Sequence, residues 1–517
     1  MPNPQWIADL LPPALSGASG ASASAAEAGA VLRTVSIEGN TVFSGSAVRS
    51  LYEGFLGRPL DANAAAQIVA RITAKYREAG FFLSHAIAPP QSLAEGMLRV
   101  RVIEGYVDKV VIEGAVRDRD LRPYAAAVSN ERPLRLSTLE RALTIIKDLP
   151  GVTAIPSLAP IDEGTGRYEL VLKADASRVT GYLGIDNRGP RYIGPWEAQA
   201  SASVTSTLVP FDQFTASLFT VPNLPREFIA DEIAYDVPLG SRGLRAAFGV
   251  THSSFHPGGY LASADLSGST MIYGTGLKYP MLRDRTRSLW LGSSFTLTDS
   301  HEKEPAARLF DDHLRVLRAD ATYTVTDPWG GNTQIFTQLS EGLPGLGASR
   351  LASASPSTPN GHAAFTKIAA SLTHERPIVG DFSAFFDFGA QKAFQPLLLS
   401  EQFSLGGARF GRGYDPSEAL GDNAVAGAVE LRYGRALSNP MVNSFQLYAF
   451  YDLGEVWNMD PANPMRQASL SSAGAGVRLG LTHGFYFSLE VAKPLTRPLL
   501  HEGDKPFRVF GRLSKMF

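Results

Sequence analysis

The C-terminal part of the chain repeats one pattern, in which apolar and polar side chains alternate along short segments. From Thr180 to Phe517 there are about sixteen such segments and no convincing amphipathic helix. Alternation places the apolar side chains of a strand on one face. Because so many strands in series would expose their apolar faces to water, the pattern predicts a 16-stranded antiparallel transmembrane β-barrel, with lipid outside and a polar lumen inside. The alternative is a soluble β-sandwich.

The expected strands are separated by connections that alternate between short and long, as periplasmic turns and external loops do in membrane barrels. The longest connections are 342–363 and 394–421. The strands are expected near residues 179–188, 195–207, 211–222, 226–237, 242–253, 271–280, 285–298, 312–325, 332–341, 364–377, 381–393, 422–434, 444–457, 469–481, 483–495 and 505–517.

The alternation also fixes which side chains face lipid, because a slip of one residue turns every side chain of a strand over. We expect a lipid-facing set of Phe445, Leu447, Tyr451, Phe485, Phe487, Leu489, Phe507 and Phe517. The lumen-facing set is Gln446, Asp452, Tyr486, Glu490, Arg508 and Arg512. The chain ends on an aromatic residue of the lipid-facing set, which is the usual assembly signal of outer-membrane barrels.

Composition excludes several classes of protein. The chain has no cysteine, which excludes disulfides and thiolate metal sites. Its net charge of −2 leaves no basic footprint for nucleic acid. No apolar run reaches the roughly 20 residues of a membrane helix. An exported protein needs a signal peptide, yet no Lys or Arg precedes Arg33, so we expect the start of the sequence to be trimmed or mis-set.

The N-terminal part contains an internal repeat of one small α+β module. Val35-Ser36-Ile37-Glu38-Gly39 is echoed by Val110-Val111-Ile112-Glu113-Gly114, and a β-α-α-β-β order follows each. Helical spacing appears at Val48, Leu51 and Phe55 and again at Ile68, Ile72 and Tyr76. Helices are also expected at 117–127 and 138–148, the second with Ser137 and Glu140 as a capping box. We divide the chain into four parts. Residues 1–30 contain a possible short helix and a flexible linker, residues 31–105 and 106–176 are the two modules, and residues 177–517 are the barrel.

Two motifs in the C-terminal third predict a contact inside the barrel. Gly411-Arg412-Gly413-Tyr414 lies in a long external loop, and Phe450-Tyr451-Asp452-Leu453-Gly454 lies in a later strand. The alternation of side chains between the two faces of a strand, here called parity, turns Asp452 and Glu430 toward the lumen from adjacent strands. A guanidinium presents planar donors to carboxylates and stays charged, so Arg412 on a loop that folds inward is expected to pair with Asp452, with Glu430 nearby.

These motifs, together with the repeated module, resemble the superfamily of outer-membrane transporters and insertases that combine POTRA modules with a barrel. Two POTRA copies, and Gly181 to Gly189 as a first barrel strand, resemble its two-partner secretion branch (the TpsB type of haemolysin and haemagglutinin export). The resemblance implies a loop-to-wall motif of Arg412, Gly413, Tyr414, Glu430, Asp452 and Gly454. It also implies a pore-plugging helix at Pro4–Leu15.

The same resemblance implies transport without enzymatic chemistry or a cofactor. An unfolded exoprotein of adhesin or haemolysin type would add a strand to the POTRA sheets at 81–88 or 152–158, contacting Phe81, Leu83, Ile87 and Ile155. Outer-membrane lipid and the barrel assembly machinery are the other expected partners, in the envelope of a Gram-negative bacterium.

Other functions were weighed against this one. His252 and His256 are four residues apart but lie in a stretch that runs from strand to loop, where this spacing does not form a metal site. No phosphate-binding glycine loop and no Gly-x-Ser-x-Gly elbow is present. An outer-membrane assembly insertase remains the main alternative, and the repeated modules argue against a passive porin.

Overall fold

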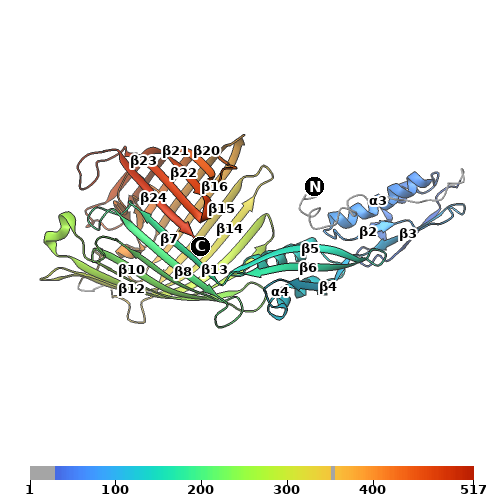
Figure 1. The fold of residues 1–517 in the computed structure, drawn as a ribbon, viewed down its shortest axis with the longest axis horizontal. Helices are drawn as coiled ribbons and strands as arrows, with labels where there is room; N and C mark the ends of the chain where they lie inside the picture. The colour runs from blue at the N-terminus through green and yellow to red at the C-terminus, as the bar shows by residue number, and fades with distance from the viewer. Residues whose placement is uncertain (1–29, 351–354) are drawn as a thin grey trace. The chain divides into compact units, whose positions relative to one another are not determined.

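The computed structural model describes residues 30–350 and 355–517 (Figure 1). The chain divides into two compact units, Met1–Ala176 and Ser177–Phe517. The helix expected at Pro4–Leu15 and most of the linker before residue 31 lie outside the described residues. In the described ranges, no helix is both long enough and apolar enough to cross a membrane.

The first unit contains two three-stranded sheets with one topology. The first sheet has the order β1-β3-β2 and the second the order β4-β6-β5, each with one parallel and one antiparallel pairing. The elements of the first module are β1 Thr34–Glu38, α2 Gly45–Arg49, α3 Ala62–Glu78, β2 His85–Ile87 and β3 Met97–Ile103. Those of the second are β4 Tyr106–Glu113, α4 Asp118–Asn130, α5 Leu136–Lys147, β5 Val152–Asp162 and β6 Arg167–Ala176.

The glycine after the first strand of each module explains the repeated Ile-Glu-Gly sequence. Gly39 has φ +80° and Gly114 has φ +103°, a region that favours glycine. A Cβ on Gly39 would lie 2.3 Å from the carbonyl oxygen of Val102, and one on Gly114 would lie 2.4 Å from that of Ala174. The two turns are therefore equivalent, and the structure confirms two copies of one α+β module.

Three local expectations in this unit are wrong. Helix α5 begins at Leu136 with Arg135 as its N-cap, so Ser137 is already helical and forms no capping box with Glu140. The strand expected over 81–88 is only His85–Ile87. Phe81 instead packs its ring edge against Tyr76 in the core.

The second unit is a closed barrel of sixteen antiparallel strands, as the alternation predicts. Strand β24 pairs with β7 to close it. Their bounds are β7 Val179–Asp186, β8 Glu197–Thr205, β9 Gln213–Thr220, β10 Phe228–Pro238, β11 Arg245–Phe255, β12 Ser267–Arg283, β13 Arg287–Lys303, β14 Arg308–Thr326, β15 Asn332–Gly342, β16 Thr366–Val379, β17 Phe382–Ala393, β20 Asn423–Ala436, β21 Val442–Trp457, β22 Gln467–Leu481, β23 Phe485–Pro494 and β24 Arg508–Met516.

The wall has the register that parity predicts. In β21, Leu447 and Tyr451 are exposed on the outer face, whereas Asp452 is fully buried on the inner one. In β23, Leu489 is exposed and its neighbour Glu490 is buried. Apolar side chains therefore cover most of the outer face, and Asp452 and Glu490 lie in the lumen.

Candidate functional site

The connection between β17 and β20, residues 394–422, folds into the barrel rather than outward. We call it the lumen loop. It contains a small hairpin of β18 (Phe403–Leu405) and β19 (Ala419–Gly421). The hairpin packs on inward-facing side chains of three wall strands, which are Ala424, Ala426, Ala428, Val456, Ala468 and Leu470. The lumen face is therefore small and apolar here, not polar as the sequence suggested, and this lets the hairpin lie against the wall.

Glycines bring the lumen loop and the wall into direct contact. A Cβ on Gly413 would lie 2.7 Å from the backbone nitrogen of Pro494 in β23. A Cβ on Gly454 in β21 would lie 2.7 Å from the Leu405 side chain of the hairpin. Both motif glycines thus stand where a side chain would force the loop and the wall apart.

The side chain of Arg412, at the tip of the loop, lies among three carboxylates of the wall. Its Nη1 atom is 2.5 Å from Oε1 of Glu430 and 3.6 Å from Oε2 of Glu490, and its Nε is 3.8 Å from Oδ2 of Asp452. All four side chains are buried. We call them the tip cluster. Because β20, β21 and β23 each supply one carboxylate, a single loop side chain is bound to three strands.

Asp452 holds the backbone of the loop rather than its guanidinium. Its carboxylate accepts hydrogen bonds from the backbone N–H groups of Gly411 at 2.9 Å and Arg412 at 3.2 Å, and from the Ser472 hydroxyl at 2.6 Å. The sequence paired Arg412 with Asp452 and placed Glu430 nearby. The structure brings all three together, but Glu430 is the closest ion partner of Arg412.

Further arginines surround the tip cluster. Arg432 and Arg478 both donate to Glu430, and Arg188 donates to Glu490 at 2.7 Å. Three wall carboxylates therefore face four guanidiniums, Arg412 included. Parity indicated that Glu490 faces the lumen, but it gave no sign that Arg478 and Arg188 reach the same place.

Tyr414 extends the attachment to the external loop 495–507. Its side chain is buried, and its hydroxyl donates to the carbonyl oxygen of Arg497 at 3.0 Å while accepting from the Arg497 N–H at 3.1 Å. One residue further on, Asp415 forms an ion pair with Arg508 at the start of β24. The tip of the lumen loop is therefore fastened across the last strands of the barrel.

A second buried cluster fastens the beginning of the lumen loop with the opposite polarity. Here the loop supplies the carboxylate, Glu401, and the wall supplies the cations. Lys367 in β16 places Nζ 2.8 Å from Oε2 of Glu401, and Arg318 in β14 pairs with Oε1. We call these three residues the base cluster. Sequence reasoning missed it, because nothing local marks Glu401 as buried.

The expected exoprotein contacts divide into two groups. The sheet orders place β2 and β5 at edges, as expected. Ile87 is half-exposed and Ile155 is 66% exposed, but Phe81 and Leu83 are buried in the fold and offer no surface. Pro156 and Pro160 of β5 carry no N–H, so they remove two donors from this edge strand.

His252 and His256 each lie beside a different carboxylate. Nδ1 of His252 is 3.0 Å from Asp231, and Nε2 of His256 is 3.4 Å from Asp265. Within residues 30–350 and 355–517, no group of three or more metal-ligating side chains comes together.

Comparisons with known proteins agree with this architecture. Residues 169–479 match the family model described as haemolysin secretion/activation protein ShlB/FhaC/HecB, and residues 30–105 match the ShlB-type POTRA domain. The heme/hemopexin transporter protein HuxB of Haemophilus influenzae is 23% identical, covering 86% of this chain and 80% of its own. The outer membrane transporter CdiB of Dickeya dadantii is 22% identical, covering 83% and 76%.

Solved structures show the same fold. CdiB from Escherichia coli superposes with a TM-score of 0.79 at 20% identity, covering 97% of this chain and 93% of that one. BamA from Haemophilus ducreyi lacking POTRA domains 1–3 superposes with a TM-score of 0.54 at 13% identity, covering 94% and 100%.

Proposed function

Because this chain belongs to the haemolysin secretion/activation family of outer-membrane transporters, we propose that it captures one unfolded exoprotein in the periplasm and moves it through its barrel to the cell surface. The matched family is described as a haemolysin secretion/activation protein, and two of the relatives are named as transporters. We assign residues 31–105 and 106–176 to the two POTRA modules and 177–517 to the barrel.

The lumen loop carries this proposal. A barrel of sixteen strands is wide enough for an aqueous channel. In this chain the channel contains a loop that is attached by ion pairs and hydrogen bonds, without a covalent link across the lumen. Such contacts can break and re-form, so the loop acts as a removable obstruction, and transport requires it to shift.

Two attachments of opposite charge define the closed position. The tip cluster binds the loop to β20, β21 and β23, and the base cluster binds it to β14 and β16. Because the loop contributes a cation at one attachment and an anion at the other, sliding it along the wall would place like charges together. Arg412 and Glu401 therefore set the position of the loop, and Gly413, Tyr414 and Gly454 allow its close approach.

Capture takes place on the POTRA modules. An unfolded chain adds a strand to the edge of β2, where main-chain hydrogen bonds give affinity without strict sequence. Ile87 and Ile155 supply apolar contacts beside the two edges. The prolines in β5 favour β2 as the strand that pairs, although β2 is only His85–Ile87.

The partner is a large secreted protein of adhesin or haemolysin type. The description of the matched family, haemolysin secretion/activation protein, supports a partner of this type. The barrel assembly machinery inserts the transporter into outer-membrane lipid.

The test is deletion of residues 31–175 in a strain that secretes an exoprotein only when the full-length chain is present. The shortened barrel is expected to insert, as heat-modifiable migration on gels reports, while exoprotein in the medium is lost. Normal secretion by the barrel alone would refute the proposal. If the deletion instead depletes other outer-membrane proteins and spares the exoprotein, the chain is an insertase.

A further inference from the structure

The barrel closes through its shortest strand pairing. Strands β7 and β24 are joined by five residue pairs, from Tyr182–Met516 to Asp186–Arg512, whereas β23 and β24 share eight. Beyond these pairs the backbone N–H of Asn187 still donates to the Gly511 carbonyl at 3.3 Å, and the Asn187 side chain adds two more hydrogen bonds to β24. It donates to the Val509 carbonyl at 2.9 Å and accepts from the Gly511 N–H at 2.7 Å.

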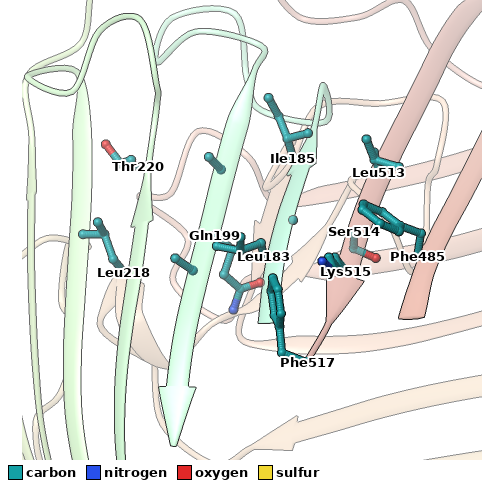
Figure 2. Close-up of a pocket in the computed structure, with 13 residues that line it drawn as sticks. Leu183, Ile185, Gln199, Leu218, Thr220, Phe485, Leu513, Ser514, Lys515 and Phe517 are labelled. Carbon is teal, nitrogen blue, oxygen red and sulfur yellow. The ribbon is translucent and has the colours of Figure 1, made fainter. Parts of the chain in front are cut away.

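A groove of about 490 Å³ runs over this closure on the outer face of the barrel (Figure 2). Its walls are outward-facing apolar side chains, namely Leu183, Ile185, Leu218, Phe485, Leu513 and Phe517. The small residues Ala198 and Ala200 of β8 lie between the larger side chains of β7 and β9, and this difference in size produces the hollow. The lining comes from five adjacent strands, which at about 4.8 Å spacing span roughly 19 Å.

A lysine lies at one end of this groove. Lys515 shares the outward face of β24, and its Nζ is 4.9 Å from the ring centre of Phe485 and 4.2 Å from that of Phe517. Phe485 directly follows the short turn 482–484, so this end is the periplasmic one. Among the described residues, no carboxylate forms an ion pair with Lys515. A cation at this end of a lipid-facing wall, with rings as its protein neighbours, can pair with an anionic group from outside the protein.

We propose that a phospholipid of the periplasmic leaflet binds at this site, with its phosphate on Lys515 and an acyl chain in the groove across the β7–β24 closure. Because barrel strands tilt by about 35–45°, the roughly 19 Å across them rises about 12 Å along the membrane normal, which lies within one leaflet of about 15 Å. The bound chain covers apolar surface on both sides of the shortest pairing and so stabilises it. The inference rests on the membrane location of the barrel and not on what the barrel transports.

The test measures phospholipid retained by the purified full-length protein in mild detergent, using native mass spectrometry. Dioleoyl phosphatidylglycerol and dioleoyl phosphatidylethanolamine are added as probes, and dioleoyl glycerol is the phosphate-free comparison. We expect the unmodified protein to retain one molecule of either phospholipid and none of the diacylglycerol. Lys515→Gln should lower retention about tenfold, the scale of one lost charge-assisted contact.

Two further variants distinguish a specific lipid-binding site from the lipid that surrounds any membrane barrel. Ala200→Phe fills the groove, keeps Lys515 and should also abolish retention; if it fails to fold on gels, Ala198→Leu replaces it. Lys493→Gln is the matched control, because Lys493 also faces outward, with Nζ 4.6 Å from the Phe507 ring, but lies outside the groove. If all variants retain equal amounts of phospholipid, the retained molecules are surrounding lipid only and the proposal is overturned. Replacement of both phospholipids by lipopolysaccharide overturns it as well.

Discussion

Replacing Arg412 with alanine is the most direct test of how the lumen loop is held. The change removes the ion contacts to Glu430, Glu490 and Asp452. It leaves the backbone N–H groups of Gly411 and residue 412 on Asp452. We therefore expect the tip to loosen while the barrel still assembles.

The wall keeps most of its charge pairing in this variant. Glu430 retains Arg432 and Arg478, and Glu490 retains Arg188 and a hydrogen bond from Tyr448 at 2.7 Å. Removing one partner of a buried ion pair costs about 3–5 kcal/mol when the other is left alone. Since these carboxylates are not left alone, we expect a cost of about 2–3 kcal/mol in loop docking, which is roughly 30- to 150-fold in its equilibrium.

The assay is conductance of the purified full-length protein in planar lipid bilayers, which needs no exoprotein. Arg412→Ala should raise the ratio of open to closed time, by up to the roughly 30- to 150-fold change predicted for loop docking. Arg409→Ala is the matched control in the same loop. Arg409 pairs with Asp387 at 2.6 Å, but its side chain is 49% exposed, and exposed pairs contribute about 0–1 kcal/mol.

The reasoning fails under either of two results. Conductance of Arg412→Ala equal to that of the unmodified protein would show that the tip cluster does not hold the loop closed. An effect of Arg409→Ala as large as that of Arg412→Ala would show that burial of the cluster is irrelevant.

The remaining predictions concern the base cluster, the wall register and the POTRA unit. Glu401→Gln should also raise open-state occupancy, and its effect should add in free energy to that of Arg412→Ala, because the two attachments share no residue; strong non-additivity in bilayer recordings would contradict this. Cysteine at Tyr486 should react with a water-soluble maleimide and cysteine at Leu489 should not, and the reverse pattern would overturn the register; the chain has no native cysteine to interfere. Burial lowers the pKa of His85 in the folded state below its unfolded value of about 6.5, so its stabilising contribution is present above that pH and is lost as pH falls. Urea unfolding of residues 30–176 should show a loss of stability between pH 7.5 and 5.5 that His85→Gln reduces, and an unchanged pH dependence in the variant would exclude this role.

Sequence alone determined the properties that depend on local periodicity. Alternation with a period of two predicted the barrel strands and turned Glu430, Asp452 and Glu490 into the lumen. The repeated glycine turn predicted two like modules, because a positive φ is a local requirement. The two motifs predicted that Arg412 lies near Asp452 and Glu430.

Only the tertiary structure decided which side chains pair with one another. Glu430 rather than Asp452 is the closest carboxylate to Arg412, because Asp452 is occupied by backbone N–H groups of the loop. Lys367 and Glu401 lie close together only because the lumen loop folds into the barrel. Phe81 and Leu83 are buried by the packing of their own module, which no strand pattern reveals. Each of these depends on distances between segments that lie far apart in the chain. The face of a strand on which a side chain lies depends only on its place in the local alternation.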